Sequence, residues 1–443
     1  MSHVFHRQCH VQLPIIASGE GIYLFDTNGK KYLDGCGGAA VSNLGHSHPA
    51  VKAAIKQQLD TIPFAHTAFF TNKNCEQLAD LLIDLAPEPL NHVYFVSGGS
   101  EAVESALKMA RQYFVEIGKP QKTKYIARRQ SYHGNTLGAL AVGGNEWRKE
   151  KFKPLLATIE HIAPCNAYRD QKEGETELDY SFRVANELET RILELGAENV
   201  MAFVAEPVVG ATSGAVPATK GYLKRIREIC DQYDVLLILD EVMCGIGRTG
   251  TFYAFEQDEI VPDLVTIAKG LGAGYIPIGA VVASSKIFDG IAHGSGFFQH
   301  GHTFMAHPMA TAAALATVKT IINDGLLDKV KVRGIKLRDK LIADILPLPY
   351  VGDVRGRGLF LGIELVVDKV TKTPLSTSTE AHKTVKKFAM ENGLMCYPMG
   401  GTINGVDGHH ILIAPPFIID DIQIHELVSK LKASLIQASE RWS

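Results

Sequence analysis

Short apolar runs alternate with amphipathic segments through the middle of the chain. The run His92–Val96 is typical of a buried strand, and apolar positions then recur with helical spacing over Glu101–Gly118. The same pattern predicts a helix at Lys220–Tyr233 and strands at Lys124–Arg128, Met201–Ala205, Val235–Leu239, Leu264–Ala268 and Ile278–Ala283. This alternation favours the α/β fold class, with a mostly parallel central sheet and helices on both faces.

The two ends of the chain show a different pattern. Residues 21–34 alternate around Asn28 and Gly29, which predicts a β-hairpin. After Gly325 the pattern indicates a helix, short strands and a final helix. A chain of 443 residues exceeds what one hydrophobic core usually supports, so we expect two domains. They are a large α/β domain at 50–325 and a smaller α+β domain formed by 1–49 and 326–443.

The composition narrows the functional classes. The formal net charge is only −3 and no block of like charges occurs, so neither nucleic acid nor a membrane is an expected partner. The segment Met1–Pro14 lacks the apolar core of a signal peptide, and no apolar run is long enough to span a bilayer. The cysteines form no CxxC pair, which fits a reducing compartment, and we expect a cytoplasmic protein.

A glycine-rich segment, Ser97 to Glu101, lies between the first predicted strand and its helix. Backbone N–H groups and the positive end of a helix dipole meet at such a junction, and glycine allows a phosphate to approach closely. The alternative is a simple glycine turn in which Ser100 caps the helix. The segment is therefore a candidate anion site, and its chemistry depends on what lies beside it.

Asp240 and Lys269 each follow an apolar run. A carboxylate at the end of a buried parallel strand faces the crevice where ligands bind in such sheets, although it can also be a plain turn cap. A lysine at a strand end is unusual, and desolvation lowers its pKa and makes the amine a nucleophile toward carbonyl groups. With the glycine-rich segment, these residues supply three parts of a pyridoxal-phosphate site.

Two other patterns suggest different chemistry. Gly245–Gly250 matches the GxGxxG pattern of dinucleotide-binding proteins, but it neither follows a strand directly nor opens a helix, which argues against that function. The pairs His46/His48 and His300/His302 lack further ligands at suitable spacing. We therefore expect these histidines to lie in loops, and we predict no metal site.

Taken in order, these residues resemble the class III aminotransferases, which have the pyridoxal-phosphate-dependent fold type I. The resemblance covers Gly21 to Phe417, and each motif is weak alone, whereas the ordered set is highly specific. The motifs are Asp26–Gly29, Leu44–His46, Ser97–Ala102, Tyr132–Gly134, Glu206-Pro207, Asp240–Val242, Gly247–Gly250, Lys269-Gly270, His302–Phe304, Arg355-Gly356 and Ala414–Pro416.

The resemblance implies roles for individual residues. Lys269 and Asp240 would be catalytic: Lys269 would hold pyridoxal 5'-phosphate as a Schiff base and move a proton, and Asp240 would keep the ring nitrogen protonated. Thr303 would contact the phosphate of the neighbouring subunit's cofactor, which implies a homodimer with shared sites. The implied cofactor-binding residues are Gly99, Ser100, Tyr132, His133, Glu206, Asp240, Val242, Lys269 and Thr303.

The implied activity is a ping-pong transfer of an amino group from an amine or ω-amino acid to a 2-oxo acid. Ala40 stands where some members carry a pocket tryptophan, which suggests more room for the amine. Gly405 stands where a carboxylate-binding arginine is expected, so we favour pyruvate over 2-oxoglutarate as the acceptor. The alternatives are an aminomutase or amino-acid racemase on the same scaffold, and a non-catalytic pyridoxal-phosphate or metabolite-binding protein.

Overall fold

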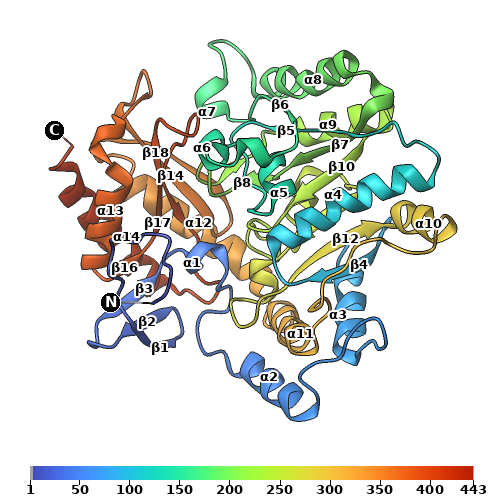
Figure 1. Ribbon diagram of the computed structural model, residues 1–443. Helices are drawn as coiled ribbons and strands as arrows, with labels where there is room; N and C mark the ends of the chain where they lie inside the picture. Colours follow the sequence, from blue (N-terminus) through green and yellow to red (C-terminus); the bar gives the residue numbers. More distant parts are fainter. Residues whose placement is uncertain (1–2, 443) are drawn as a thin grey trace.

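A large twisted sheet forms the centre of the computed structural model, which describes residues 3–442 (Figure 1). Its strands lie in the order β4-β12-β11-β10-β7-β5-β6. Neighbours from β11 to β6 are parallel, and β12 alone among these strands runs antiparallel to both of its neighbours. The predicted mostly parallel sheet is therefore confirmed. The strands are β4 Leu90–Val96, β5 Lys124–Arg128, β6 Glu160–Ile162, β7 Val200–Ala205, β10 Leu236–Asp240, β11 Leu264–Ile267 and β12 Gly279–Ser284.

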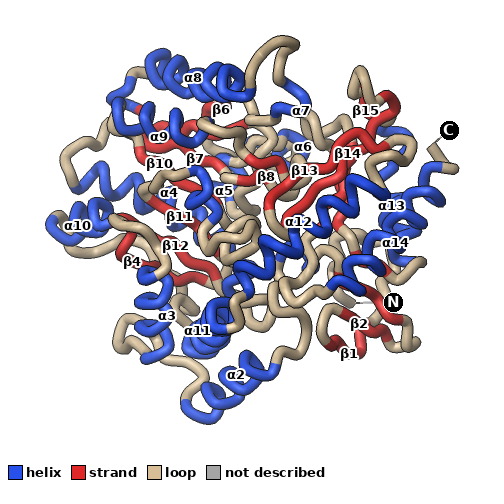
Figure 2. The backbone as a smooth tube through the Cα atoms, turned by 180° about the vertical axis from the view of Figure 1, so that it is seen from behind, coloured by secondary structure: helices blue, strands red, loops and turns tan. Residues whose placement is uncertain are grey.

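Both faces of this sheet are buried under helices (Figure 2). Leu237 and Leu239 of β10 pack in one apolar cluster, whereas Leu236 and Ile238 pack in another on the opposite face. Continuous apolar strands are what a sheet covered on two sides requires. The second cluster is completed by α4 Gly99–Glu116, α5 Leu137–Val142 and α10 Ser285–His293, and the first by α3 Lys73–Asp84, α8 Glu177–Leu195, α9 Tyr222–Gln232 and α11 Pro308–Asn323.

The two ends of the chain meet in smaller sheets. The predicted hairpin is present as β2 and β3, and β3 also pairs in parallel with β16 from the C-terminal part. The predicted division near residues 50 and 325 stays a prediction, and its outer limits, 1 and 443, lie outside the described residues. The strands are β1 Ile16–Glu20, β2 Tyr23–Asp26, β3 Lys31–Asp34, β13 Val351–Arg357, β14 Phe360–Asp368, β15 Thr373–Pro374, β16 Leu394–Met395, β17 Tyr397–Gly400 and β18 His409–Ile413.

Several elements were not predicted because they are short or sparsely apolar. Strand β13 carries only two buried apolar side chains, Val351 and Val354, so it shows no clear alternation. Within residues 3–442, no helix has the length and apolar character needed to cross a bilayer. The predicted helix after Gly325 and the predicted final helix are present as α12 Leu326–Asp344 and α14 Asp421–Ser439. The remaining elements are α1 Gly37–Ala40, α2 Pro49–Thr61, α6 Glu146–Lys149, α7 Ala167–Asp170, α13 Ala381–Glu391, β8 Val208–Val209 and β9 Val216–Pro217.

A buried ion pair ties the loop around Gly214 to β13 and β14. Glu364 is fully buried on β14, and its Oε2 lies 2.6 Å from Nη1 of Arg355. The same arginine donates from Nε to the Gly214 carbonyl oxygen at 3.0 Å. The Gly214 backbone consequently rests against β14 at Gly362, where a side chain would have no room.

We expect Gly362→Ala to destabilise the fold, because the added Cβ would lie 1.9 Å from the Gly214 carbonyl oxygen. Overpacking of this kind costs about 1–3 kcal/mol. Thermal unfolding measures the loss, with Gly301→Ala as the matched control, since its new Cβ would meet only Met305 Sδ at 3.7 Å. Equal melting temperatures for the two variants would contradict the expected clash.

Candidate active site

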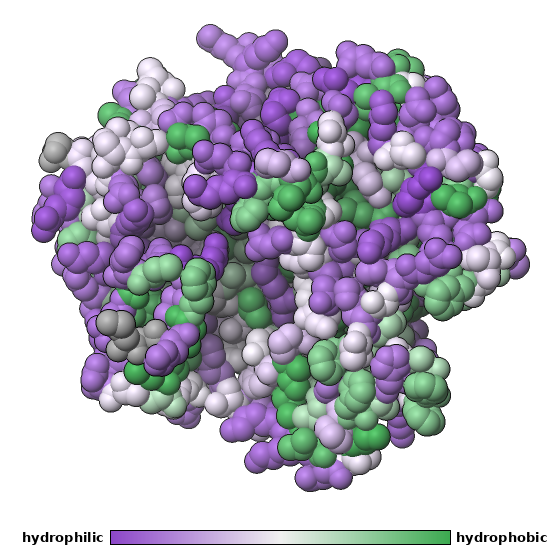
Figure 3. Space-filling view, viewed as in Figure 1, coloured by the Kyte–Doolittle hydropathy of each residue, from purple (hydrophilic) through white to green (hydrophobic). Residues whose placement is uncertain are grey.

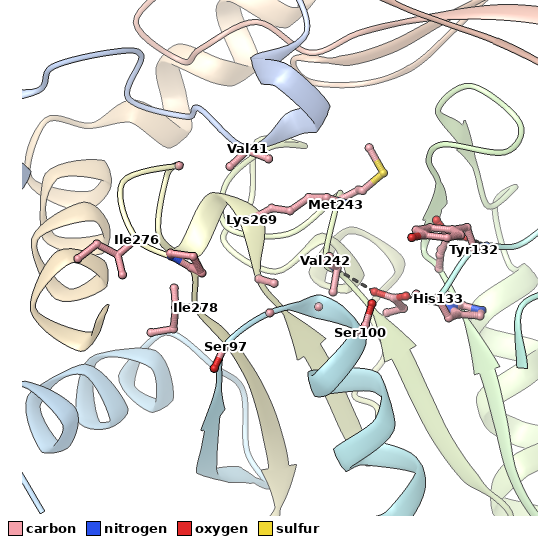
Figure 4. Close-up of a pocket in the computed structure, with 18 residues that line it drawn as sticks. Val41, Ser97, Ser100, Tyr132, His133, Val242, Met243, Lys269, Ile276 and Ile278 are labelled. Carbon is pink, nitrogen blue, oxygen red and sulfur yellow. Dashed lines mark hydrogen bonds and ion pairs between the residues drawn. The ribbon is translucent and has the colours of Figure 1, made fainter. Parts of the chain in front are cut away.

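A cavity of about 360 Å³ lies where β4, β10 and β11 end. Parallel strands present their carboxyl ends at one edge of a sheet, and ligands bind in the crevice outside that edge. Figure 4 shows Lys269, Val242 and Tyr132 around this cavity, with Ser100 at the start of α4. The lining includes these predicted cofactor-binding residues: Gly99, Ser100, Tyr132, His133, Glu206, Asp240, Val242 and Lys269.

The first turn of α4 forms one wall of the cavity. Helix α4 begins at Gly99 with Gly98 as its N-cap, so Ser100 lies inside the first turn and is not the cap. A Cβ on Gly99 would come within 2.8 Å of Val242 Cγ1, which explains why only glycine fits there. The N-terminus of this long helix presents free N–H groups and positive potential, the features that bind a phosphate.

The Asp240 carboxylate is buried and held from several sides. His133 Nδ1 lies 2.8 Å from Oδ2, and Oδ1 accepts hydrogen bonds from the Val242 N–H at 3.0 Å and the Thr266 hydroxyl at 3.2 Å. Within the described residues, the buried His133 Nε2 has no hydrogen-bond partner. The carboxylate therefore has a fixed orientation at the end of β10, where it is suited to hold a positively charged partner.

Lys269 follows β11 and has a left-handed backbone, with φ of 45°. Burial lowers the pKa of its amine, and the charges of Asp240 and Glu206 partly oppose that shift. A lowered pKa leaves more of the amine unprotonated near neutral pH, where it is a nucleophile and a proton acceptor. Its position in the cavity wall combines that reactivity with access to a ligand.

Glu206 supports the wall formed by Tyr132. Its carboxylate accepts the Tyr132 N–H at 3.0 Å and the Gly210 N–H at 2.9 Å. Burial raises the pKa of Glu206, although the neighbouring His133 opposes the shift. The residue therefore positions the backbone on which the Tyr132 ring enters the cavity.

Thr303 lies apart from this cavity. It is exposed in the loop that precedes α11 and does not line the site within this chain.

Several lining residues were not predicted, because a single side chain on a loop leaves no pattern in the sequence. They are Val41, Met243, Ile276 and Ile278.

Comparison with known sequences identifies the family of this chain. The sequence matches the family described as aminotransferase class III over residues 4–435. The chain belongs to the class III aminotransferases. This aminotransferase is 41% identical over 98% of its length to an uncharacterized aminotransferase of Schizosaccharomyces pombe, of which it covers 95%. It is 36% identical over 96% of its length to the putrescine–pyruvate aminotransferase of Pseudomonas aeruginosa, of which it covers 91%.

Solved structures show the same fold. The omega transaminase of Pseudomonas jessenii in complex with PMP is 32% identical to this aminotransferase, with a TM-score of 0.92, and the match covers 99% of this chain and 97% of that one. The predictions of a class III aminotransferase and of fold type I are therefore confirmed. The family depends on pyridoxal phosphate.

We expect the Lys269 amine of the cofactor-free protein to titrate below the ordinary lysine value of about 10.4, because burial disfavours its charged form. Competitive labelling with an amine-selective reagent across pH, read by peptide mass spectrometry, gives the midpoint. Asp240→Asn should lower the midpoint further, since the Asp240 charge favours the protonated amine. An ordinary midpoint in the wild-type protein would contradict the burial of this amine.

Proposed function

We propose that this aminotransferase holds pyridoxal 5'-phosphate in the cavity and transfers an amino group from an amine or ω-amino acid to a 2-oxo acid in two half-reactions. The observation that supports this most directly is the meeting of Lys269, Asp240 and the first turn of α4 in one cavity. A lone buried lysine or a lone helix terminus has many explanations. An amine of lowered pKa, a fixed carboxylate and an anion site side by side fit the three ends of this cofactor.

The residues present fit the cofactor in size and charge. Gly99 leaves a space beside Val242 that any side chain would fill, and the N-terminus of α4 suits a phosphate. Asp240 offers a carboxylate to a ring nitrogen, and Lys269 offers an amine to a carbonyl carbon. Tyr132 and Val242 supply an aromatic and an apolar surface for a flat ring.

Each residue then has a task in the reaction. When bound, the cofactor withdraws electrons from the carbon that loses a proton. Asp240, fixed by His133 and Thr266, stabilises the proton on the ring nitrogen. The Lys269 amine accepts a proton from the substrate carbon and returns it, a role that its lowered pKa favours. The N–H groups of the first turn of α4 hold the phosphate in place.

The substrate side of the cavity is apolar. Val41, Met243, Ile276 and Ile278 line it, which favours an amine with a hydrocarbon body. Ala40 is buried beside Met243 in an apolar cluster and adds no bulk to the cavity. We infer that larger amines and ω-amino acids are donors, and that pyruvate is the preferred acceptor, in line with the putrescine–pyruvate aminotransferase among the relatives.

We infer that two copies of the chain pair through an exposed aromatic surface beside Thr303. Phe69, Phe70 and Phe304 are all more than half exposed, and Phe304 packs edge-on against Phe64 with ring centroids 5.7 Å apart. Figure 3 shows apolar side chains gathered in this region, where Figure 1 draws α2, α3 and α11. Apolar patches of this kind are typical of protein interfaces. Thr303 would then reach the partner's cofactor phosphate.

We expect the cofactor-loaded protein to convert to its pyridoxamine form when an amine is added, with one carbonyl product released for each site. Addition of pyruvate should restore the starting absorbance and produce alanine. Borohydride reduction before peptide mapping should place the cofactor on Lys269, and Lys269→Ala is the control. An aminomutase or racemase would release no carbonyl product in stoichiometric amount, and a binding protein would show no conversion.

Mixed dimers test the shared site. Subunits carrying Lys269→Ala, paired with subunits carrying Thr303→Ala, should keep one intact site, because both defects fall on the same cavity when Thr303 serves the partner. We expect about half of the wild-type activity per mixed dimer and little activity in either parent dimer. Loss of both sites in the mixed dimer would show that Thr303 acts within its own subunit.

A further inference from the structure

An arginine that has no carboxylate partner among the described residues stacks on Tyr132, a residue of the cavity wall. Arg148 belongs to α6, and its guanidinium carbon lies 4.4 Å from the centroid of the Tyr132 ring. Tyr132 lines the cavity, so the guanidinium lies beside the site. Such stacking fixes the plane of an arginine while its N–H groups remain able to bind an anion.

Two other cations near Arg148 are already paired with a carboxylate. Lys149 and Lys153 both contact Glu146, at 3.0 and 2.9 Å. In the part of the chain that the structure describes, the Arg148 guanidinium stacks on Tyr132 but makes no ion pair and no hydrogen bond. A partly buried guanidinium is well suited to bind a carboxylate, and the described residues supply none.

The position of α6 is fixed by a chain of hydrogen bonds. Asn145 caps the helix by accepting the Arg148 N–H, and its amide donates to Gln130 at 3.1 Å. Gln130 in turn donates to the carbonyl oxygens of Gly401 and Thr402, at 2.8 and 2.9 Å. The hairpin loop 401–408 is thereby attached to α6. It contains no arginine.

The same loop lies directly on α6. A Cβ on Gly405 would come within 3.2 Å of the Trp147 N, so this glycine permits the close contact. The charge of Arg148 is also near enough to Lys269 to lower the pKa of its amine. The guanidinium thus acts electrostatically on the position at which the substrate reacts.

We infer that Arg148 binds the carboxylate of the 2-oxo acid acceptor. This assignment rests on the proposed function and adds the residue that recognises the acceptor. A single planar guanidinium pairs with one carboxylate in a bidentate manner, which suits a small monocarboxylic 2-oxo acid such as pyruvate. An amine donor without a carboxylate needs no contact with Arg148.

Measuring the two half-reactions separately distinguishes binding of the acceptor carboxylate from general support of the active site. In Arg148→Gln we expect kcat/KM for pyruvate to fall about 10- to 100-fold, the range for loss of a hydrogen bond to a charged group. Single-turnover conversion by putrescine, which has no carboxylate, should be unchanged, as should the absorbance of the bound cofactor. Arg148→Lys should recover part of the pyruvate activity, and Lys153→Gln, which removes a nearby exposed charge, should match the wild type.

A binding measurement makes the assignment independent of turnover. Propanoate carries the carboxylate but neither an oxo nor an amino group, and calorimetry on the holoenzyme should show it binding at least 10-fold more weakly to Arg148→Gln than to the wild type. This readout holds even if the wild type transfers no amino group, an outcome that would refute the proposed function but not the carboxylate site.

Three results would overturn the assignment. Unchanged pyruvate kinetics and propanoate binding in Arg148→Gln would show that the guanidinium does not meet the carboxylate. Equal losses in the putrescine and pyruvate half-reactions would mean that Arg148 only supports the Tyr132 ring. A selective pyruvate defect in Arg7→Gln, with none in Arg148→Gln, would assign the carboxylate to Arg7. Burial raises the pKa of Tyr132, and Arg7 is the other arginine whose charge opposes that rise.

Discussion

The site depends on one buried carboxylate with a fixed orientation. Asp240 ends β10, and its oxygens are held by His133, by the Val242 N–H and by Thr266 of the adjacent strand. A buried charge is costly unless it is hydrogen-bonded, so these contacts offset that cost and define where the carboxylate points. They come from three separate segments, which meet only because the central sheet brings their ends to one edge.

The pairing of β10 with β11 shows how strongly the site depends on register. Asp240 lies opposite Thr266, and Lys269 follows three residues later along the chain. A shift by one residue would turn Thr266 away from Asp240 and place its side chain on the other face of the sheet. A shift would also exchange the side chains that fill the two apolar clusters, because each face of these strands packs in its own cluster. The register of β10 and β11 therefore determines both the packing of the core and the geometry of the site.

The sequence predicted those site residues that stand at a recognisable position in a regular pattern of apolar residues. Asp240 and Lys269 are recognisable because each interrupts a run of apolar positions, and Gly99 because it opens a helix after a strand. Thr266 was not recognised, since its contact depends on a strand register that the sequence does not display. Arg148 was missed as well, because α6 is only four residues long and has no periodicity.

The reversed strand β12 brings an additional segment of the chain to the edge of the sheet where the cavity lies. A strand that runs against its neighbours begins where they end, so the segment entering β12 arrives at the same edge as the loops leaving β4 and β11. Ile276 and Ile278 reach the cavity in this way, and Gly279 lies so close to Gly98 that a Cβ there would be 2.5 Å from the Gly98 carbonyl oxygen. If β12 ran parallel to its neighbours, the segment that enters it would lie at the opposite edge of the sheet. One inverted strand therefore adds a wall to the cavity that is separate from the strand ends near Asp240 and Lys269.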